Sequence, residues 1–249
     1  MRIPLAVVDT TSMADASARA IGKGNEKLGR RVGTFSLPSV HTCHLGSTPT
    51  CRSLCYADSP QSHFSMPATQ RRYWTNLAFT RDHRFVPEMI GRIAGKKLVA
   101  FRWHVSGDLY SAGYAAKVLA VMSATPEAPA YIYTRAWRDA GVRSVLTAMA
   151  ALPHVQVWLS CDRDSGQPAA VPGTRRAYLQ TLPGDEPEYP VDLVFRDRPA
   201  RRTVAKRVAG AMVCPVENGV SHAVTCDRCR VCFSDPVVDP ARRTRRDAA

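Results

Sequence analysis

Apolar residues in the middle of the chain follow two periods that alternate with each other. The segment LVAFRWHV at residues 98–105 is an almost unbroken apolar run, and AYIYTR (130–135) and HVQVWLSCDR (154–163) repeat this pattern. Runs of this length, bounded by polar residues, are typical of strands buried on both faces of a parallel sheet. Residues 32–38 predict a further strand, and weaker strands are expected at 178–182 and 191–195.

Helical periodicity separates the predicted strands. Apolar residues at intervals of three and four predict helices over residues 66–79, 85–93, 112–123 and 136–151. Strands that alternate with helices of this length imply parallel β-α-β crossovers, which occur in doubly wound sheets and in full or partial barrels. We favour an α/β fold built as a partial or full parallel (β/α) barrel, with a C-terminal cysteine-rich cluster segment.

Composition divides the chain into four parts. Residues 1–31 show no firm period and form an N-terminal extension, in which Gly22, Gly24 and Gly29 interrupt any helix. Residues 32–200 carry the alternating pattern and form the barrel-like domain. Residues 201–240 form a cysteine-rich metal-binding segment, and residues 241–249, ARRTRRDAA, form a basic tail that we expect to be disordered.

The overall composition is that of a soluble protein. Hydrophobic residues make up 45% of the 249 positions, and no stretch approaches the roughly 18 uninterrupted apolar residues of a membrane span. The N-terminal apolar run is interrupted by Asp9 and is short for a signal-peptide core. We therefore expect a cytoplasmic protein without a membrane partner. In a reducing compartment, eight cysteines are more typical of metal binding or redox chemistry than of disulfides.

The net charge of +13 raises the question of nucleic-acid binding. Clustered basic residues neutralise phosphates and release counterions, which drives such binding. The basic residues here are scattered rather than clustered outside the tail, as the pairs Arg30-Arg31, Arg71-Arg72, Arg175-Arg176 and Arg201-Arg202 show. The charge therefore allows nucleic acid as a partner, but its distribution does not favour it.

Polar residues follow the predicted strands at their carboxyl ends, where ligands bind in parallel α/β folds. The segments concerned are the cysteine loop after the first strand, His104 with Ser106, Gly107 and Asp108 after the second, Thr134-Arg135 after the third, and Ser160-Cys161-Asp162-Arg163 after the fourth. Each could be an ordinary loop start, with Asp108 or Asp162 capping the next helix. Their recurrence favours a shared site, in which the segment from His104 to Asp108 binds a cofactor.

Cys43, Cys51 and Cys55 form the first cysteine group, with spacings of seven and three residues. We call this group the trio. Three thiolates on one loop can hold three irons of a [4Fe-4S] cluster and leave the fourth iron open to a ligand. The spacing matches no single metal rule. A zinc site completed by His41, His44 or a distant residue, and a loop of thiols without metal, are therefore alternatives.

Cys214, Cys226, Cys229 and Cys232 form the second group, which we call the quartet. A C-x2-C-x2-C run turns successive thiolates towards one centre, as in ferredoxin-type loops, and Cys214 supplies a fourth ligand. Four ligands make a closed site, which is structural or transfers electrons. A four-cysteine zinc site is the competing interpretation. The remaining cysteine, Cys161, lies at a strand end beside Asp162 and could be a ligand or nucleophile, but we favour its interpretation as a small buried hydrophobic residue.

These motifs occur in an order that resembles a known family. The order is C-x7-C-x3-C-Y-A, R-W-H-V-S-G-D, Y-T-R, L-S-C-D-R, and then C-P followed by C-x2-C-x2-C. Over roughly residues 28 to 235, this set resembles the phage "gene product 88" family of actinobacterial phages and their hosts. The layout of that family is similar to that of radical S-adenosylmethionine enzymes, which place a three-cysteine loop after the first barrel strand and a cysteine cluster near the C-terminus.

The resemblance implies a specific chemistry. The trio would carry a [4Fe-4S] cluster whose open iron binds S-adenosylmethionine, and reductive cleavage would give a radical that abstracts hydrogen from a substrate. Asp108, Arg135 and Asp162 would act as catalytic residues lining the cofactor or substrate pocket, and the quartet would hold an auxiliary cluster. Radical enzymes typically show C-x3-C-x2-C, and the spacing of the trio departs from that pattern.

Two functional hypotheses follow. The first is an iron-sulfur enzyme of radical type that acts on a small-molecule or other substrate and receives electrons from a donor. The second is a zinc-stabilised nucleic-acid-binding or regulatory protein, in which the quartet forms a ribbon and arginines contact phosphates. The two hypotheses predict different metals, so metal content separates them.

Overall fold

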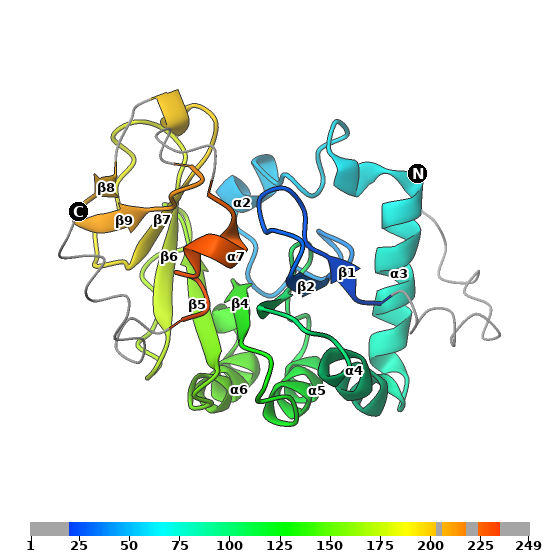
Figure 1. Ribbon diagram of the computed structural model, residues 1–249. Helices are drawn as coiled ribbons and strands as arrows, with labels where there is room; N and C mark the ends of the chain where they lie inside the picture. The colour runs from blue at the N-terminus through cyan, green and yellow to red at the C-terminus, as the bar shows by residue number, and fades with distance from the viewer. Residues whose placement is uncertain (1–19, 203–205, 218–223, 235–249) are drawn as a thin grey trace.

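Nine strands form one sheet in which the strands follow one another almost in chain order (Figure 1). The order is β1-β2-β3-β4-β5-β6-β7-β9-β8. Strands β2 to β7 and β9 run parallel, whereas β1 and β8 add antiparallel strands at the two edges. The strands are β1 (Gly22–Lys23), β2 (Val32–Phe35), β3 (Ala100–Trp103), β4 (Ala130–Thr134), β5 (Val155–Cys161), β6 (Arg175–Gln180), β7 (Leu193–Arg196), β8 (Arg207–Val208) and β9 (Ala211–Val213).

This computed structural model describes residues 20–202, 206–217 and 224–234. The basic tail and most of the predicted N-terminal extension lie outside these residues. The helices are α2 (Pro49–Ser53), α3 (Pro67–Arg81), α4 (Phe85–Ala94), α5 (Ala112–Ser123), α6 (Ala140–Ala150) and α7 (Cys226–Cys229), with short 3-10 turns η3 (His63–Ser65), η4 (Ala136–Arg138) and η5 (Ala200–Arg202). In the described part of the chain, no helix has the length and apolar character needed to span a bilayer.

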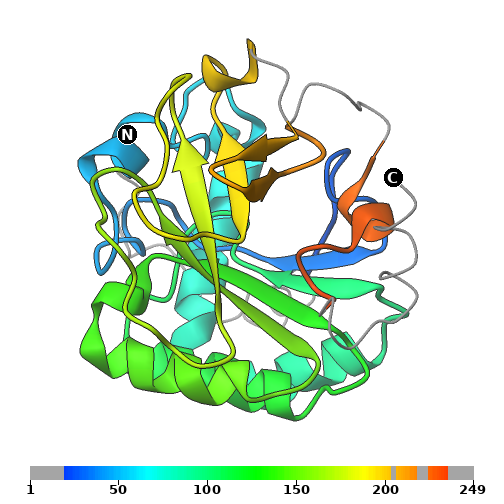
Figure 2. The same ribbon diagram turned by 90° about the vertical axis from the view of Figure 1, so that its left-hand side faces the viewer.

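The long helices α4, α5 and α6 lie on one face of the sheet (Figure 2). Consecutive strand order explains this arrangement, because right-handed crossovers that all advance in one direction place their helices on the same side. A doubly wound sheet would instead reverse its strand order and carry helices on both faces. The expected parallel β-α-β architecture is confirmed for this half of the chain, and the doubly wound alternative does not apply.

The sheet does not close into a barrel. Its edges are the antiparallel strands β1 and β8, and β1 pairs with β2 while β8 pairs with β9. The prediction of a full barrel is therefore wrong, and the fold is an open, mostly parallel nine-stranded sheet. The sequence pattern could not reveal this difference, because alternation of strands and helices specifies parallel crossovers but not closure. The three short strands β1, β8 and β9 carry too few residues to show a period.

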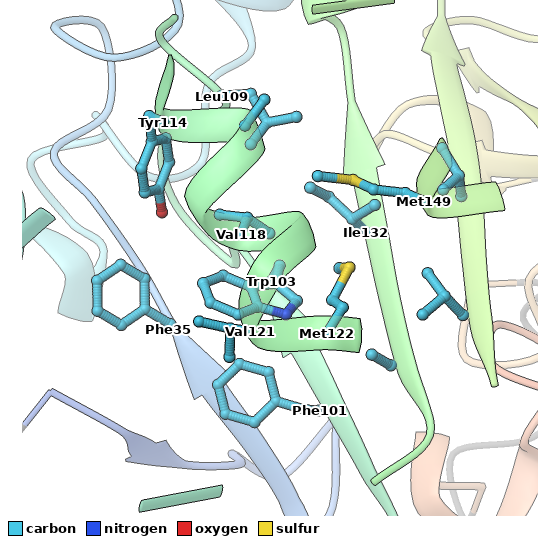
Figure 3. Close-up of a cluster of buried hydrophobic side chains, with 14 of the residues drawn as sticks. Phe35, Phe101, Trp103, Leu109, Tyr114, Val118, Val121, Met122, Ile132 and Met149 are labelled. Atoms are coloured by element: carbon cyan, nitrogen blue, oxygen red, sulfur yellow. The ribbon is translucent and has the colours of Figure 1, made fainter. Parts of the chain in front are cut away.

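Alternate side chains of the central strands point to opposite faces of the sheet and belong to two different cores. Phe101 and Trp103 of β3 face the helices, where they pack with Val118, Val121 and Met122 of α5 (Figure 3). The helix α5 begins where the side chain of Ser111 accepts a hydrogen bond from the backbone N–H of Tyr114. This apolar core fixes the strands, and with them the loops at their carboxyl ends.

The opposite face of the sheet is lined by aromatic side chains, and we call it the aromatic face. Tyr133 stacks on Trp158 with ring centroids 5.5 Å apart, and Phe195 meets Tyr133 edge-on at 5.2 Å. The C-terminal segment covers this face, where Phe233 stacks on Tyr131 at 5.5 Å. The indole N–H of Trp158 donates to the carbonyl of Cys232 at 2.9 Å. The described part of the cysteine-rich segment therefore packs on the sheet through Phe233 and Cys232.

Candidate metal and cofactor site

The trio lies on the loop that follows β2, and a short helix in this loop carries Cys51. Thr48 begins α2, and its side chain accepts a hydrogen bond from the backbone N–H of Cys51 at 3.0 Å. Pro49 occupies the first helical position, where its fixed φ suits the turn. The hydroxyl of Thr42 donates to the carbonyl of Pro38 at 2.7 Å, which holds the segment before Cys43. Local capping thus orders the backbone around the trio.

The loop docks against the carboxyl ends of β4 and β5. The hydroxyl of Thr48 donates to Asp162 at 2.7 Å, and Arg135 forms an ion pair with the same carboxylate oxygen at 2.7 Å. The side chain of Asp162 is fully buried. Its other oxygen accepts from the backbone N–H groups of Asp164 and Ser165 at 2.9 and 3.0 Å. Asp162 therefore joins the trio loop, β4 and β5, and its carboxylate already has four partners.

Asp108, after the end of β3, connects this strand to β4 in a similar way. One carboxylate oxygen accepts from the Thr134 hydroxyl and from the backbone N–H of Leu109, both at 2.7 Å. The other oxygen accepts from the backbone N–H of Arg135 at 2.8 Å. Burial raises the pKa of this carboxyl, although these hydrogen bonds oppose the shift. The geometry assigns Asp108 a structural connection between β3 and β4.

Ser106 and Gly107 hold the start of the trio loop against β3. The hydroxyl of Ser106 donates to the carbonyl of Leu37 at 2.9 Å, and the N–H of Leu37 donates to the carbonyl of Ser106 at 2.9 Å. Gly107 has a φ of 78°, and a Cβ there would lie 2.6 Å from the Thr42 hydroxyl oxygen. The predicted cofactor-binding segment therefore contacts the trio loop directly, mainly through its backbone.

The trio thiols share one electrostatic neighbourhood with the three predicted catalytic residues. Burial raises the pKa of the Cys43 thiol to about 12, and Asp108 adds to this shift. Burial also raises the pKa of Cys51. The positive charge of Arg135 opposes this shift, whereas the negative charges of Cys55, Asp162 and Asp108 add to it. The fold thus brings the trio together with Asp108, Arg135 and Asp162, as the strand-end argument predicted.

His104 faces the helix layer instead. Its imidazole Nε2 lies 2.9 Å from the hydroxyl of Tyr114 in α5, and its φ is 58°. Among the described residues, its Nδ1 has no hydrogen-bond partner. Burial lowers the pKa of His104 to about 3, and Arg102 contributes to the same direction. The predicted role of His104 in cofactor binding stays a prediction.

The low pKa of His104 predicts a pH-dependent stability. In the folded protein its pKa is about 3, below the value of about 6.5 for unfolded histidine, so the unfolded chain binds more protons between these values. The contribution of neutral His104 to the free energy of unfolding is complete above about pH 6.5. It is lost as the pH falls towards the folded-state pKa, by up to about 1.4 kcal/mol per pH unit. Urea unfolding at several pH values should show a shallower pH dependence in His104→Asn than in the wild type; parallel curves would contradict the assignment.

The quartet is assembled on the aromatic face from two segments. Cys214 follows β9, and its backbone N–H donates to the carbonyl of Val194 in β7 at 2.8 Å. The other three cysteines lie in and after α7, whose first residue Cys226 donates its N–H to the carbonyl of Lys27 at 2.9 Å. All four cysteines line one small cavity together with Leu193, Pro215, Val216, Arg230 and Val231.

Positive charge lies beside the quartet. Burial raises the pKa of Cys214 and of Cys232 to about 12 and raises that of Cys226. Lys27 opposes the shift at Cys214, and Arg102 opposes it at Cys226 and Cys232. Both cations therefore favour thiolates at the quartet, whereas desolvation favours thiols.

The donor set fits a thiolate-bound metal, although the sulfur atoms do not converge as they lie. Within residues 20–202, 206–217 and 224–234, no three or more His, Cys, Asp or Glu side chains are arranged to hold a metal ion. All eight cysteines are free of disulfides. Thiolates are the preferred ligands of zinc and of iron-sulfur clusters, and the four quartet cysteines line a common cavity. Metal binding would require their side chains to turn into that cavity.

Comparison with known proteins identifies the family. A family model described as Gene product 88 matches residues 13–235. The chain belongs to the Gene product 88 family. The match begins at residue 13, earlier than the motifs alone indicated, so it includes part of the predicted extension. No curated protein and no solved structure matches the chain.

In this Gene product 88 chain, sequence reasoning missed two cations beside the quartet, Arg102 and Lys27. The signal for Arg102 was present, because it is a charged residue within the apolar run LVAFRWHV. A strand buried on both faces carries such a residue only when something compensates its charge. Lys27 gave no such signal, because it lies in a segment without periodicity and contacts Glu217, whose carboxylate is 2.6 Å from its ammonium group.

Cys161 lies outside both cysteine groups. It is fully buried at the end of β5, and its thiol donates to the carbonyl of Ala177 at 3.3 Å. It packs with Tyr178 and Val194 in a separate apolar cluster. This environment agrees with the interpretation of Cys161 as a small buried hydrophobic residue.

Proposed function

We propose that this Gene product 88 protein is an iron-sulfur protein, with a closed cluster at the quartet and an open one at the trio. The observation that carries the proposal is the common cavity lined by Cys214, Cys226, Cys229 and Cys232. Four cysteines from two segments separated along the chain line one cavity, next to the cations Lys27 and Arg102. A set of buried and partly buried thiols without disulfides supports metal ligation better than it supports ordinary packing.

The trio is proposed as the reactive site. It lies at the carboxyl ends of the parallel strands, where α/β folds bind their ligands. Cys43, Cys51 and Cys55 would hold the cluster, whose open iron would supply a binding site for the amino and carboxylate groups of S-adenosylmethionine and a source of electrons. An external electron donor would supply those electrons, and a substrate would bind at the same strand ends.

The chain's own residues would organise this site rather than react. Asp162 accepts four interactions from the trio loop and from β4 and β5, and Asp108 accepts three from its neighbours. Carboxylates with this many partners orient the backbone and have little remaining capacity for proton transfer. Arg135 holds a positive charge next to the thiol of Cys51, which favours the thiolate form needed for metal binding.

Metal analysis after anaerobic purification tests the proposal. We expect a brown protein with broad absorption at about 400 nm and with iron and inorganic sulfide in equal amounts. The double variant Cys51→Ala/Cys55→Ala should lose about half of the iron and keep its fold, because the quartet is a separate site. Cys229→Ala/Cys232→Ala should lose the other half, and Cys161→Ala serves as the matched control with full iron content.

Other outcomes have clear meanings. Loss of all iron from the trio variant would contradict two independent sites. A colourless protein with bound zinc and no iron would favour the zinc-stabilised nucleic-acid-binding or regulatory protein instead. Electron paramagnetic resonance of the reduced protein, with and without S-adenosylmethionine, tests the open iron: a change in the spectrum is expected for the wild type and for Cys161→Ala, and not for the trio variant.

A further inference from the structure

Arg102 is a partly buried cation on the aromatic face. It lies on β3, opposite Thr34 of β2 and Tyr131 of β4 in the sheet register. Its guanidinium carbon lies 5.4 Å from the ring centroid of Tyr133 and 6.0 Å from that of Tyr131. The Nε atom is buried and has no hydrogen-bond partner among the described residues. A buried guanidinium with an unpaired N–H is costly unless an anion compensates it.

The described residues supply no carboxylate for this cation. Burial by itself would lower the pKa of Arg102, yet its neighbours raise that pKa above the usual value. The neighbours responsible are three phenols and one thiol, those of Tyr56, Tyr131, Tyr133 and Cys226. No described Asp or Glu forms an ion pair with Arg102, whereas Arg135 and Lys27 each have one. Among residues 20–202, 206–217 and 224–234, no acidic side chain therefore supplies the counter-charge of Arg102.

Apart from the three phenols, the group near Arg102 that can carry negative charge is the thiol of Cys226, a member of the quartet. Cys226 and Cys232 pack in the same cluster as Tyr131 and Tyr133, beneath Phe233. The hydroxyl of Tyr133 lies beside Cys232 and, like that of Tyr131, is buried without a well-formed hydrogen bond. Three hydrogen-bond donors of the aromatic face therefore lack full partners on the side that the quartet covers.

We infer that Arg102 is the counter-cation of a thiolate-ligated metal centre held by the quartet, and that it sets the retention of the metal and its reduction potential. This inference rests on the proposed function, because it requires a metal at the quartet. A metal bound by four thiolates carries net negative charge, and sulfur accepts hydrogen bonds from N–H and O–H donors. Donors near the sulfur atoms raise the reduction potential of a cluster and stabilise its charge.

Lys27 supports the same centre from the other side. Its backbone carbonyl accepts from the N–H of Cys226 at 2.9 Å, and its ammonium group is shared with Glu217 at 2.6 Å. Because Glu217 already neutralises Lys27, this lysine has less charge to offer than Arg102. We therefore expect Arg102 to stabilise the charge of the metal centre more than Lys27 does, because its charge is not shared with a described carboxylate.

Substitution of Arg102 tests the inference on the full-length, anaerobically purified protein. Arg102→Met removes the charge and keeps an apolar side chain of similar length, and Arg102→Lys keeps the charge but loses the planar donors. The matched control is Arg175→Met, because Arg175 also lies on the sheet with its guanidinium over an aromatic ring, 5.5 Å from the ring centroid of Trp158. Iron and zinc content, the rate of metal transfer to a chelator, and the reduction potential are measured for each.

The inference predicts at least about tenfold faster metal loss from Arg102→Met, an intermediate rate for Arg102→Lys, and an unchanged rate for Arg175→Met. With iron bound, the reduction potential of Arg102→Met should be lower than that of the wild type. Should Arg102→Met fail to fold by circular dichroism, Arg102→Lys gives the decisive rate. Wild-type rates in both Arg102 variants would overturn this inference alone, whereas a wild-type protein without metal would overturn the proposed function and this inference with it.

Discussion

Gly46→Ala is expected to displace the trio loop and to destabilise the protein by more than about 3 kcal/mol. A Cβ at Gly46 would lie 2.0 Å from the carbonyl oxygen of Arg135 and 2.2 Å from its carbonyl carbon. Backbone atoms cannot turn away as a flexible side chain can. The loop must therefore move off the end of β4, and the trio moves with it.

Chemical unfolding of metal-free protein measures this effect without the contribution of a metal. Gly113→Ala is the matched control, because a Cβ at Gly113 in α5 meets nothing within 4 Å. The same chemical change should there stabilise the protein by about 0.4–1 kcal/mol, since alanine favours the helix and restricts the unfolded chain. Equal unfolding free energies for the two variants would mean that the loop does not pack against Arg135.

Arg135→Met is expected to destabilise the protein by about 3–5 kcal/mol, because it leaves a buried carboxylate without its cation. The side chain of Asp162 is fully buried, and that of Arg135 is 13% exposed. The hydrogen bonds from Thr48 and from two backbone N–H groups would remain, but they carry no full charge. Unfolding curves at neutral pH measure the loss.

The double variant Arg135→Met/Asp162→Asn distinguishes a buried ion pair from a local packing defect. Removing both charges together should recover at least half of the stability lost in Arg135→Met, because no uncompensated carboxylate remains. Recovery of nothing would indicate that Arg135 acts through packing of its side chain. In that case the carboxylate of Asp162 would be satisfied by its hydrogen bonds alone.

The sequence predicted the central fold well because the elements there are long and buried on one side by helices. The strands predicted at 130–135 and 154–163 match β4 and β5 within two residues at either end. The predicted helix at 136–151 begins instead at Ala140, because Asp139 caps α6 through a hydrogen bond from Val142 at 2.9 Å and residues Ala136–Arg138 form a 3-10 turn. A cap of this kind needs only one side chain and leaves the apolar period unchanged.

The positions of the predicted site residues near the trio could be inferred from the strand ends. The packing of the aromatic face could not be inferred from the sequence. Parallel strands must present their carboxyl ends together, so Asp108, Arg135 and Asp162 could be placed near the trio from their positions alone. The role of Arg102 depends on a segment far away in the sequence that covers it. Periodicity describes neighbours along one element, and it carries no information about which distant segment packs on the other face.

The arrangement of the C-terminal segment has a consequence for how the protein is made. Phe233 and α7 cover aromatic side chains of β4 and β5, and α7 also pairs with the backbone of the segment that precedes β2. While the ribosome is still adding residues before position 226, the sheet can form, but its aromatic face stays exposed to solvent. The nascent chain therefore exposes this apolar surface, and is prone to aggregate, until residues 226–233 have been made and have left the ribosome.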